Sequence, residues 1–119
     1  MMINTMKTAM IIASDAGART AGIIREELGK EVDLFSVSER SGCVRIDSIT
    51  DFTLRHFGDY EAFVFIGAMG ICVRAIAPCV TSKYADPAVV NVDATGHFVV
   101  SVLAGHVGGA NALTERLAR

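Results

Sequence analysis

Ala62-Phe63-Val64-Phe65-Ile66-Gly67-Ala68-Met69-Gly70 is an apolar run that ends in a glycine-rich turn, and a helical pattern follows it from Ile71 to Ala77. An apolar run without polar alternation is typical of a strand that is covered on both faces, as in a parallel sheet. Glycines at such a junction let backbone N–H groups approach a ligand, and the helix start leaves unpaired donors. The stretch therefore predicts a strand-turn-helix unit with a candidate anion pocket at its turn.

The continuous apolar run Ala9–Ala13 predicts a further strand that is covered on both faces, and Val32–Val37 and Ala88–Val92 are interpreted as two more strands. The segment Ser38–Asp47 has no clear periodicity and is interpreted as a connecting loop. Helical spacing predicts a helix that ends near Leu28 before Gly29. A second helix of about three turns fits between Ser48, whose hydroxyl can cap it with Asp51 three residues on, and Gly58.

The turn Asp93-Ala94-Thr95-Gly96 separates the run Ala88–Val92 from a further strand, Phe98–Leu103. Asp at the first position and Gly at the fourth favour a type I turn, which predicts an antiparallel hairpin. Alternating strands and helices then predict a three-layer α/β/α sandwich of Rossmann-like type. We expect one domain over residues 1–119, with a mostly parallel sheet of about five strands and the hairpin near one edge.

A second glycine-rich turn follows the last strand and surrounds a histidine, and a final helix begins near Gly108. Its members are Gly105, His106, Gly108, Gly109 and Asn111. Ligands bind beside the carboxyl ends of strands in open α/β sheets, so we expect the two glycine-rich turns to converge on one crevice. The alternative is that these glycines only form tight strand-to-helix junctions.

Composition excludes several classes of function. The formal charge is −2 and the basic residues are scattered, which argues against nucleic-acid binding. The three cysteines form no CxxC pair, and their odd number favours a reducing, cytoplasmic compartment. No signal peptide or membrane span is predicted. Dinucleotide and P-loop motifs are missing, and neither the cysteines nor the histidines have zinc-site spacing, so we expect no bound metal.

Four motifs in fixed order resemble the N-terminal domain of the cobalt-precorrin-5A hydrolase family of anaerobic cobalamin biosynthesis. They are Gly67-Ala68-Met69-Gly70 with Arg74 and Pro78, Lys83-x-x-Asp86-Pro87-Ala88-Val89-Val90, Asp93-x-x-Gly96, and Gly105-His106-x-Gly108-Gly109-Ala110-Asn111. The resemblance covers the chain from about Ala62 to its end, whereas residues 1–60 match only in pattern.

The resemblance implies an enzyme that opens the lactone ring of cobalt-precorrin-5A and releases acetaldehyde to give cobalt-precorrin-5B. The cobalt belongs to the tetrapyrrole substrate, so no protein cofactor is implied. Family members continue into a C-terminal domain, and the last helix here has no stop signal. We therefore expect an excised part of a longer enzyme, with the missing domain as its partner.

Such a substrate is a flat apolar ring with peripheral carboxylates, which seek cations and helix N-termini. Arg74 can bind a carboxylate through two N–H bonds, and Lys83 can supply a point charge. Met69 can pack against the ring. The other predicted substrate-binding residues are Gly67, Gly70, Asp86, Gly105, Gly108, Gly109 and Asn111.

Lactone opening needs an activated water, and we predict His106 as the general base with Asp93 or Asp86 orienting it. Each residue also has a structural interpretation. His106 can fix its loop by a hydrogen bond, and both aspartates can initiate turns. Two functions therefore stay open beside the hydrolase: a noncatalytic tetrapyrrole-binding module whose chemistry lies in the missing region, and a small α/β regulator of another anionic ligand.

Overall fold

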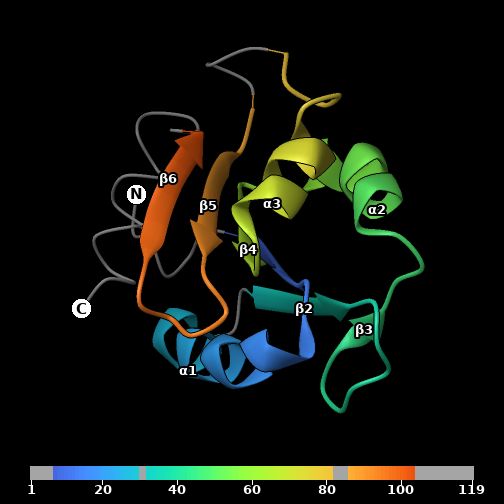
Figure 1. The fold of residues 1–119 in the computed structure, drawn as a ribbon. Helices are drawn as coiled ribbons and strands as arrows, with labels where there is room; N and C mark the ends of the chain where they lie inside the picture. The colour runs from blue at the N-terminus through green and yellow to red at the C-terminus, as the bar shows by residue number, and fades with distance from the viewer. Residues whose placement is uncertain (1–6, 30–31, 82–85, 104–119) are drawn as a thin grey trace.

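The computed structural model describes residues 7–29, 32–81 and 86–103, which form one mixed sheet with helices on both faces (Figure 1). The strands are β1 (Thr8–Ile12), β2 (Val32–Ser36), β3 (Val44–Arg45), β4 (Ala62–Ile66), β5 (Ala88–Val92) and β6 (Val99–Leu103). The helices are α1 (Ala18–Leu28), α2 (Ile49–His56) and α3 (Met69–Ile76), with short 3-10 turns η2 (Asp15–Gly17) and η3 (Phe57–Asp59).

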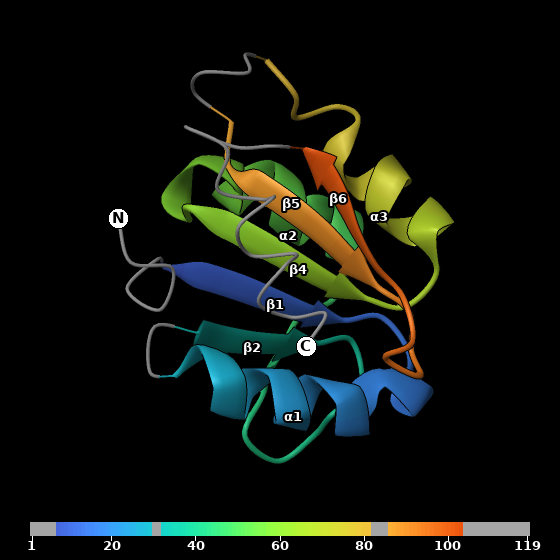
Figure 2. The same ribbon diagram turned by 90° about the vertical axis from the view of Figure 1, so that its left-hand side faces the viewer.

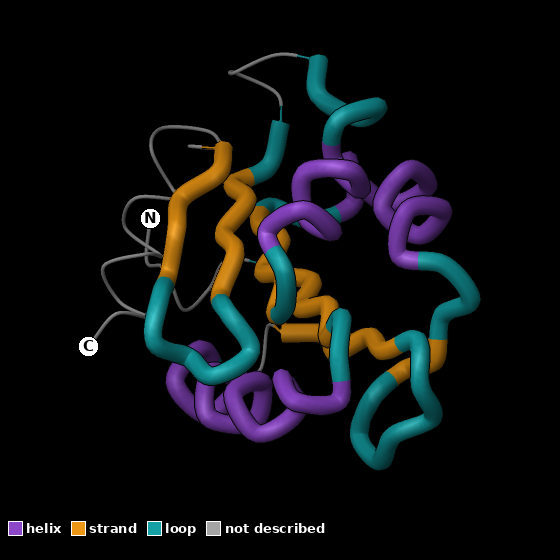
Figure 3. The backbone as a smooth tube through the Cα atoms, viewed as in Figure 1, coloured by secondary structure: helices purple, strands orange, loops and turns teal. Residues whose placement is uncertain are grey.

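The strand order is β3-β2-β1-β4-β5-β6, and only the β5–β6 pair is antiparallel. Helix α1 covers one face of the sheet, while α2 and α3 cover the other (Figure 2). Colouring by secondary structure shows the strands between the two helical layers (Figure 3). The predicted three-layer, mostly parallel architecture with an antiparallel edge pair is therefore confirmed for the described residues.

Burial on both faces explains why the central strands are continuously apolar. Alternate residues of β4 enter two separate cores: Val64 and Ile66 pack on the α1 side, whereas Phe63 and Phe65 pack on the α3 side. All five residues of β4 are buried. A strand with one solvated face would alternate apolar and polar residues, so this pattern identified the sandwich correctly.

Two of the differences between predicted and observed boundaries have a clear physical reason. The segment Ser38–Asp47, interpreted as a loop, contains the two-residue strand β3, whose Val44 pairs with Phe35 at the end of β2. Its residues are exposed, so the strand adds no apolar run by which it could be recognised. The last strand begins at Val99 rather than at Phe98, because the Phe98 N–H donates to the Asp93 side chain and stays within the turn.

No helix in the described part of the chain has the length and apolar character that a membrane span requires.

The predicted cap of α2 is present. The Ser48 hydroxyl accepts a hydrogen bond from the Asp51 N–H at 3.1 Å, which pairs a backbone donor that the first helical turn leaves open. We expect Ser48→Ala to lower the free energy of unfolding by about 1 kcal/mol. Urea denaturation measures this loss, with Ser41→Ala in an exposed loop as the control. Equal effects of the two substitutions would contradict a capping role.

Candidate functional site

The candidate site lies at the edge of the sheet where the parallel strands β1, β4 and β5 end, here termed the carboxyl edge. Beyond the strands, the Ala13 N–H donates to the Ile66 carbonyl at 2.9 Å. The Gly67 N–H donates to the Val92 carbonyl, also at 2.9 Å. The turn between β4 and α3 is therefore held between the two neighbouring strand ends, as expected for a ligand crevice in an open α/β sheet.

Glycine is required at position 67 for two reasons. Its φ is +148°, which L side chains rarely adopt, and a Cβ atom there would lie 2.8 Å from the Ala13 Cβ. The close approach lets the chain leave β4 and start α3 without separating β4 from β1. Gly67 thus shapes the backbone of the site, in agreement with its predicted place in a glycine-rich turn.

Helix α3 presents backbone donors at this edge that have no partner among the described residues. Its first intrahelical acceptor is the Ala68 carbonyl, which accepts from the N–H groups of Ile71 and Cys72. The N–H groups of Met69 and Gly70 come before these first intrahelical hydrogen bonds, and among the described residues no side chain caps the helix. The first turn of α3 therefore offers backbone donors and the positive end of a helix dipole to an anion.

The Arg74 guanidinium lies over this first turn. A Cβ built on Gly70 would be 4.0 Å from both terminal nitrogens of Arg74, one turn further along the helix. Arg74 forms no ion pair with another described residue, and its side chain is exposed. The structure thus brings together Arg74, Gly70 and Met69, three of the predicted substrate-binding residues, in an arrangement that suits a carboxylate.

Asn91 is a further residue of this site, and the sequence analysis did not identify it. It is only 5% exposed, and its side-chain N–H₂ donates to the Gly67 carbonyl at 3.2 Å. Its side-chain oxygen is buried without a hydrogen-bond partner among the described residues. A lone amide within an otherwise apolar strand was the available signal, because a buried polar side chain needs a partner that fixes its surroundings.

Asp93 follows β5 at the same edge, but its carboxylate is engaged in the hairpin turn. One oxygen accepts from the Phe98 N–H at 2.6 Å, and the other accepts from the N–H and the hydroxyl of Thr95. These bonds, led by the Thr95 hydroxyl, lower the pKa of Asp93. The Gly96 N–H also donates to the Asp93 carbonyl, which confirms the predicted turn.

Asp86 lies at the opposite edge of the sheet, just before β5 begins. It is buried, and its carboxylate accepts bonds of 2.9 Å from both the N–H and the hydroxyl of Thr81. The structure therefore does not bring Asp86 together with Gly67 and Arg74. Its position agrees with the structural interpretation, in which the aspartate organises the loop before Pro87.

The two glycine-rich turns do not leave their strands at the same edge of the sheet, and their expected convergence on one crevice stays a prediction. Leu103 pairs with Val89 near the start of β5, whereas Val99 pairs with Val92 at its end. The chain therefore leaves β6 opposite the carboxyl edge where Gly67 lies, because the hairpin reverses the strand direction. The predicted residues Lys83, Gly105, His106, Gly108, Gly109 and Asn111 lie outside the described residues.

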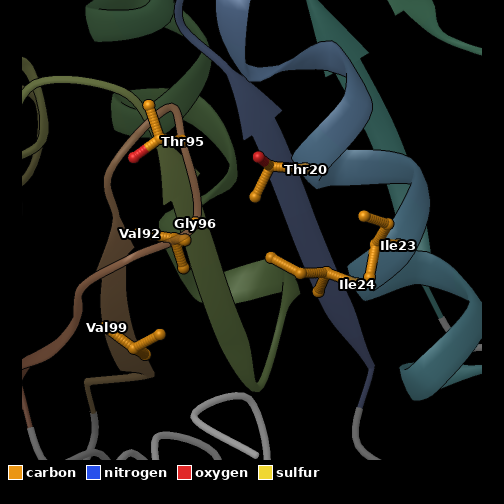
Figure 4. A pocket seen from close by; sticks show the side chains of 7 residues that line it. All are labelled: Thr20, Ile23, Ile24, Val92, Thr95, Gly96 and Val99. Carbon is orange, nitrogen blue, oxygen red and sulfur yellow. The ribbon is translucent and has the colours of Figure 1, made fainter.

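A pocket of about 200 Å³ opens beside the hairpin turn, on the α1 side of the sheet (Figure 4). It is lined by Thr20, Ile23, Ile24, Val92, Thr95, Gly96 and Val99. The Thr20 hydroxyl donates to the Ala94 carbonyl at 2.7 Å and ties α1 to the turn. Pockets that bind drug-sized ligands have volumes of about 300–1,000 Å³, so this pocket is too small to enclose a tetrapyrrole.

Within the described ranges, no group of three or more histidine, cysteine, aspartate or glutamate residues could hold a metal ion. Cys72 and Cys79 are buried, and Cys43 is half-buried. Burial raises the pKa of the Cys72 thiol to about 12, so it is neither a ready metal ligand nor a reactive thiolate.

The sequence model of the family described as cobalamin synthesis G N-terminal matches residues 51–119. This chain belongs to that family. The match contains every residue predicted for the site, from Gly67 to Asn111. The turn after β4 and the first turn of α3 are therefore parts of the cobalamin synthesis G N-terminal domain.

Two curated relatives are cobalt-precorrin-5A hydrolases. The chain is 58% identical to the protein of Salmonella typhimurium over 62 residues, which are 52% of this chain and 18% of the relative. It is 48% identical to the protein of Priestia megaterium over 62 residues, which are 52% of this chain and 17% of that relative. The chain thus matches less than a fifth of the length of either curated relative.

A crystal structure of a cobalamin biosynthesis protein G homolog from Sulfolobus solfataricus has the same fold. The TM-score is 0.75 with 25% sequence identity, over 98% of this chain and 35% of that one. The structural likeness includes β1, α1 and β2, which lie outside the family match. The cobalamin synthesis G N-terminal fold therefore accounts for almost the whole chain.

We expect Gly67→Ala to lower the free energy of unfolding by about 2–4 kcal/mol, because it combines an unfavourable φ with a steric clash at Ala13. The control is Gly22→Ala in α1, where a Cβ meets nothing within 4 Å. That substitution should stabilise the protein by about 0.5–1 kcal/mol. Urea denaturation of both variants gives the comparison, and a neutral Gly67→Ala would refute the packing described for this turn.

The lowered pKa of Asp93 predicts a pH-dependent contribution to stability. Its ionised form stabilises the hairpin fully above the unfolded-state pKa of about 4, and this stability disappears as the pH falls through the lower folded-state pKa. Asp93→Asn should therefore be less stable than the wild type at pH 7, with a gap that narrows below about pH 4. Thermal unfolding from pH 2.5 to 7 measures the gap, and a constant gap would contradict this assignment.

Proposed function

We propose that this chain is the N-terminal, substrate-binding domain of a cobalt-precorrin-5A hydrolase. In that role it takes part in opening the lactone ring of cobalt-precorrin-5A, with release of acetaldehyde to give cobalt-precorrin-5B. The observation that carries the proposal is the first turn of α3, which no described side chain caps and which lies beneath the Arg74 guanidinium, within the family match. The 58% identity to the Salmonella hydrolase supports the choice of substrate.

The chemistry of the site matches that of the substrate. A partly built corrin ring carries acetate and propionate groups at its rim, and each ionised carboxylate can accept N–H bonds from a helix start. Arg74 adds a permanent positive charge, and its guanidinium can donate two parallel N–H bonds to one carboxylate. Met69, which is 36% exposed beside these donors, supplies an apolar surface for the ring.

Residues of the predicted second turn complete the proposal. We assign His106 as the general base that activates water, and the glycine-rich turn around it as donors to the lactone oxygen. Asp93 acts indirectly by fixing the hairpin turn next to Gly67, because its carboxylate oxygens accept bonds from that turn.

A noncatalytic binding module is the second candidate function, and the contacts of Asp93 favour it. Of the two predicted catalytic residues, Asp93 is the one that the structure describes. Both of its carboxylate oxygens accept hydrogen bonds from residues of the hairpin turn, so they hold the turn together. In this alternative, the chain holds the tetrapyrrole while another part of the longer enzyme supplies the water-activating group.

Replacing Arg74 tests the binding site. We expect Arg74→Met to raise the Kd for cobalt-precorrin-5A about 10- to 100-fold, because a charge-assisted pair contributes about 1.5–3 kcal/mol. The matched control is Arg55→Met on α2, whose guanidinium pairs with Asp51 at 3.1 Å and lies outside the site. Absorption titration of the corrinoid gives both constants, and an unchanged Kd for Arg74→Met would refute the site.

Acetaldehyde release distinguishes the two functions. In the hydrolase proposal, the wild-type chain supplied with cobalt-precorrin-5A releases acetaldehyde, whereas His106→Ala binds the corrinoid but releases none. Corrinoid binding by the wild type without acetaldehyde would contradict catalysis by this chain and support the binding module.

A further inference from the structure

Helix α3 is apolar on both of its faces. Its sequence, Met69-Gly70-Ile71-Cys72-Val73-Arg74-Ala75-Ile76, contains Arg74 as its single charged residue. Cys72, Ala75 and Ile76 face the core. A helix that is apolar all round is normally covered on all sides. Helix α1 is different, because charged residues, among them Arg19, Arg25 and Glu26, occupy much of its exposed surface.

The outward surface of α3 carries a stripe of exposed aliphatic side chains, termed the outer stripe: Val73, Ala77 and Val80. Val73 and Ala77 are four residues apart and so lie on one side of the helix. Val80 continues the stripe beyond the last turn, where its N–H still donates to the Ile76 carbonyl. Val73 is 46% exposed and Val80 is 45% exposed.

The size of the outer stripe indicates the kind of partner that covers it. Three half-exposed aliphatic side chains offer roughly 200 Å², whereas a stable complex between separate proteins needs about 800 Å² from each partner. A second copy of this chain is therefore a poor occupant. A segment of the same polypeptide is a better one, because covalent attachment raises its effective concentration to about the millimolar range.

We infer that the outer stripe is the docking surface for the part of the cobalt-precorrin-5A hydrolase polypeptide that lies beyond the residues corresponding to this chain. The likeness to the Sulfolobus solfataricus homolog covers 98% of this chain and 35% of that one, so about two-thirds of such a polypeptide is left to cover the stripe. The inference depends on the proposed function only for the identity of this polypeptide. Its docking would also place protein beside Arg74, and ligand sites commonly lie between domains.

Cysteine labelling tests the inference. Val73→Cys places a thiol in the outer stripe, and Ile23→Cys places the control thiol on α1, where Ile23 is 61% exposed. Both are made in a Cys43→Ser background, because Cys43 is only half-buried while Cys72 and Cys79 are buried. The rate of reaction with N-ethylmaleimide is then compared between this chain alone and a fusion in which it replaces the matching segment of the Salmonella typhimurium relative.

We expect the fusion to slow labelling at Val73→Cys at least tenfold and to change labelling at Ile23→Cys less than twofold. Unchanged labelling at Val73→Cys, or equal slowing at both positions, overturns the inference. A rate that falls with the concentration of the chain alone would indicate a second copy and would also overturn it. Protection of Val73→Cys by added cobalt-precorrin-5A in the chain alone would assign the stripe to the corrinoid instead. The Arg74→Met titration separately tests the proposed function.

Discussion

Burial of β4 between two helical layers is the constraint on which the rest of the structure depends. Because both faces of this strand are covered, its neighbours β1 and β5 must lie close on either side, and the chain has little room to turn beyond Ile66. Gly67 meets that restriction by coming within van der Waals reach of Ala13. The position of the α3 start, and hence of its open backbone donors, follows from this packing.

The parts of the fold that depend on burial could be predicted from the sequence. Mainly apolar runs identified β1, β2, β4 and β5, and Asp93 with Gly96 identified the hairpin. Strand β3 could not be predicted because its two residues are exposed and held by pairing with the end of β2. The site was harder to predict, because its contacts join residues distant in sequence. Asn91 reaches the Gly67 carbonyl 24 positions away, and local patterns do not encode that contact.

The chain leaves β6 at the edge opposite Gly67 for a physical reason. A strand that pairs antiparallel with β5 must end where β5 begins, so predicting the hairpin already determined the edge at which Leu103 lies. The rule that ligands bind at carboxyl ends of strands holds for the parallel part of such a sheet. It applies directly to Gly67 and Met69, which follow β4, but by itself it does not place residues that follow an antiparallel edge strand.

The direction of β6 also determines how the domain is joined to its neighbouring segments. Lys7, just before β1, and Leu103, at the end of β6, lie on the same side of the sheet, away from the start of α3. The start of β1 and the end of β6 are therefore both at one edge of the sheet. The opposite, carboxyl edge is formed by the short links that follow β1, β4 and β5. Substitutions in those links can therefore change the edge that carries Gly67 and the start of α3 while the strand ends on the opposite side stay fixed.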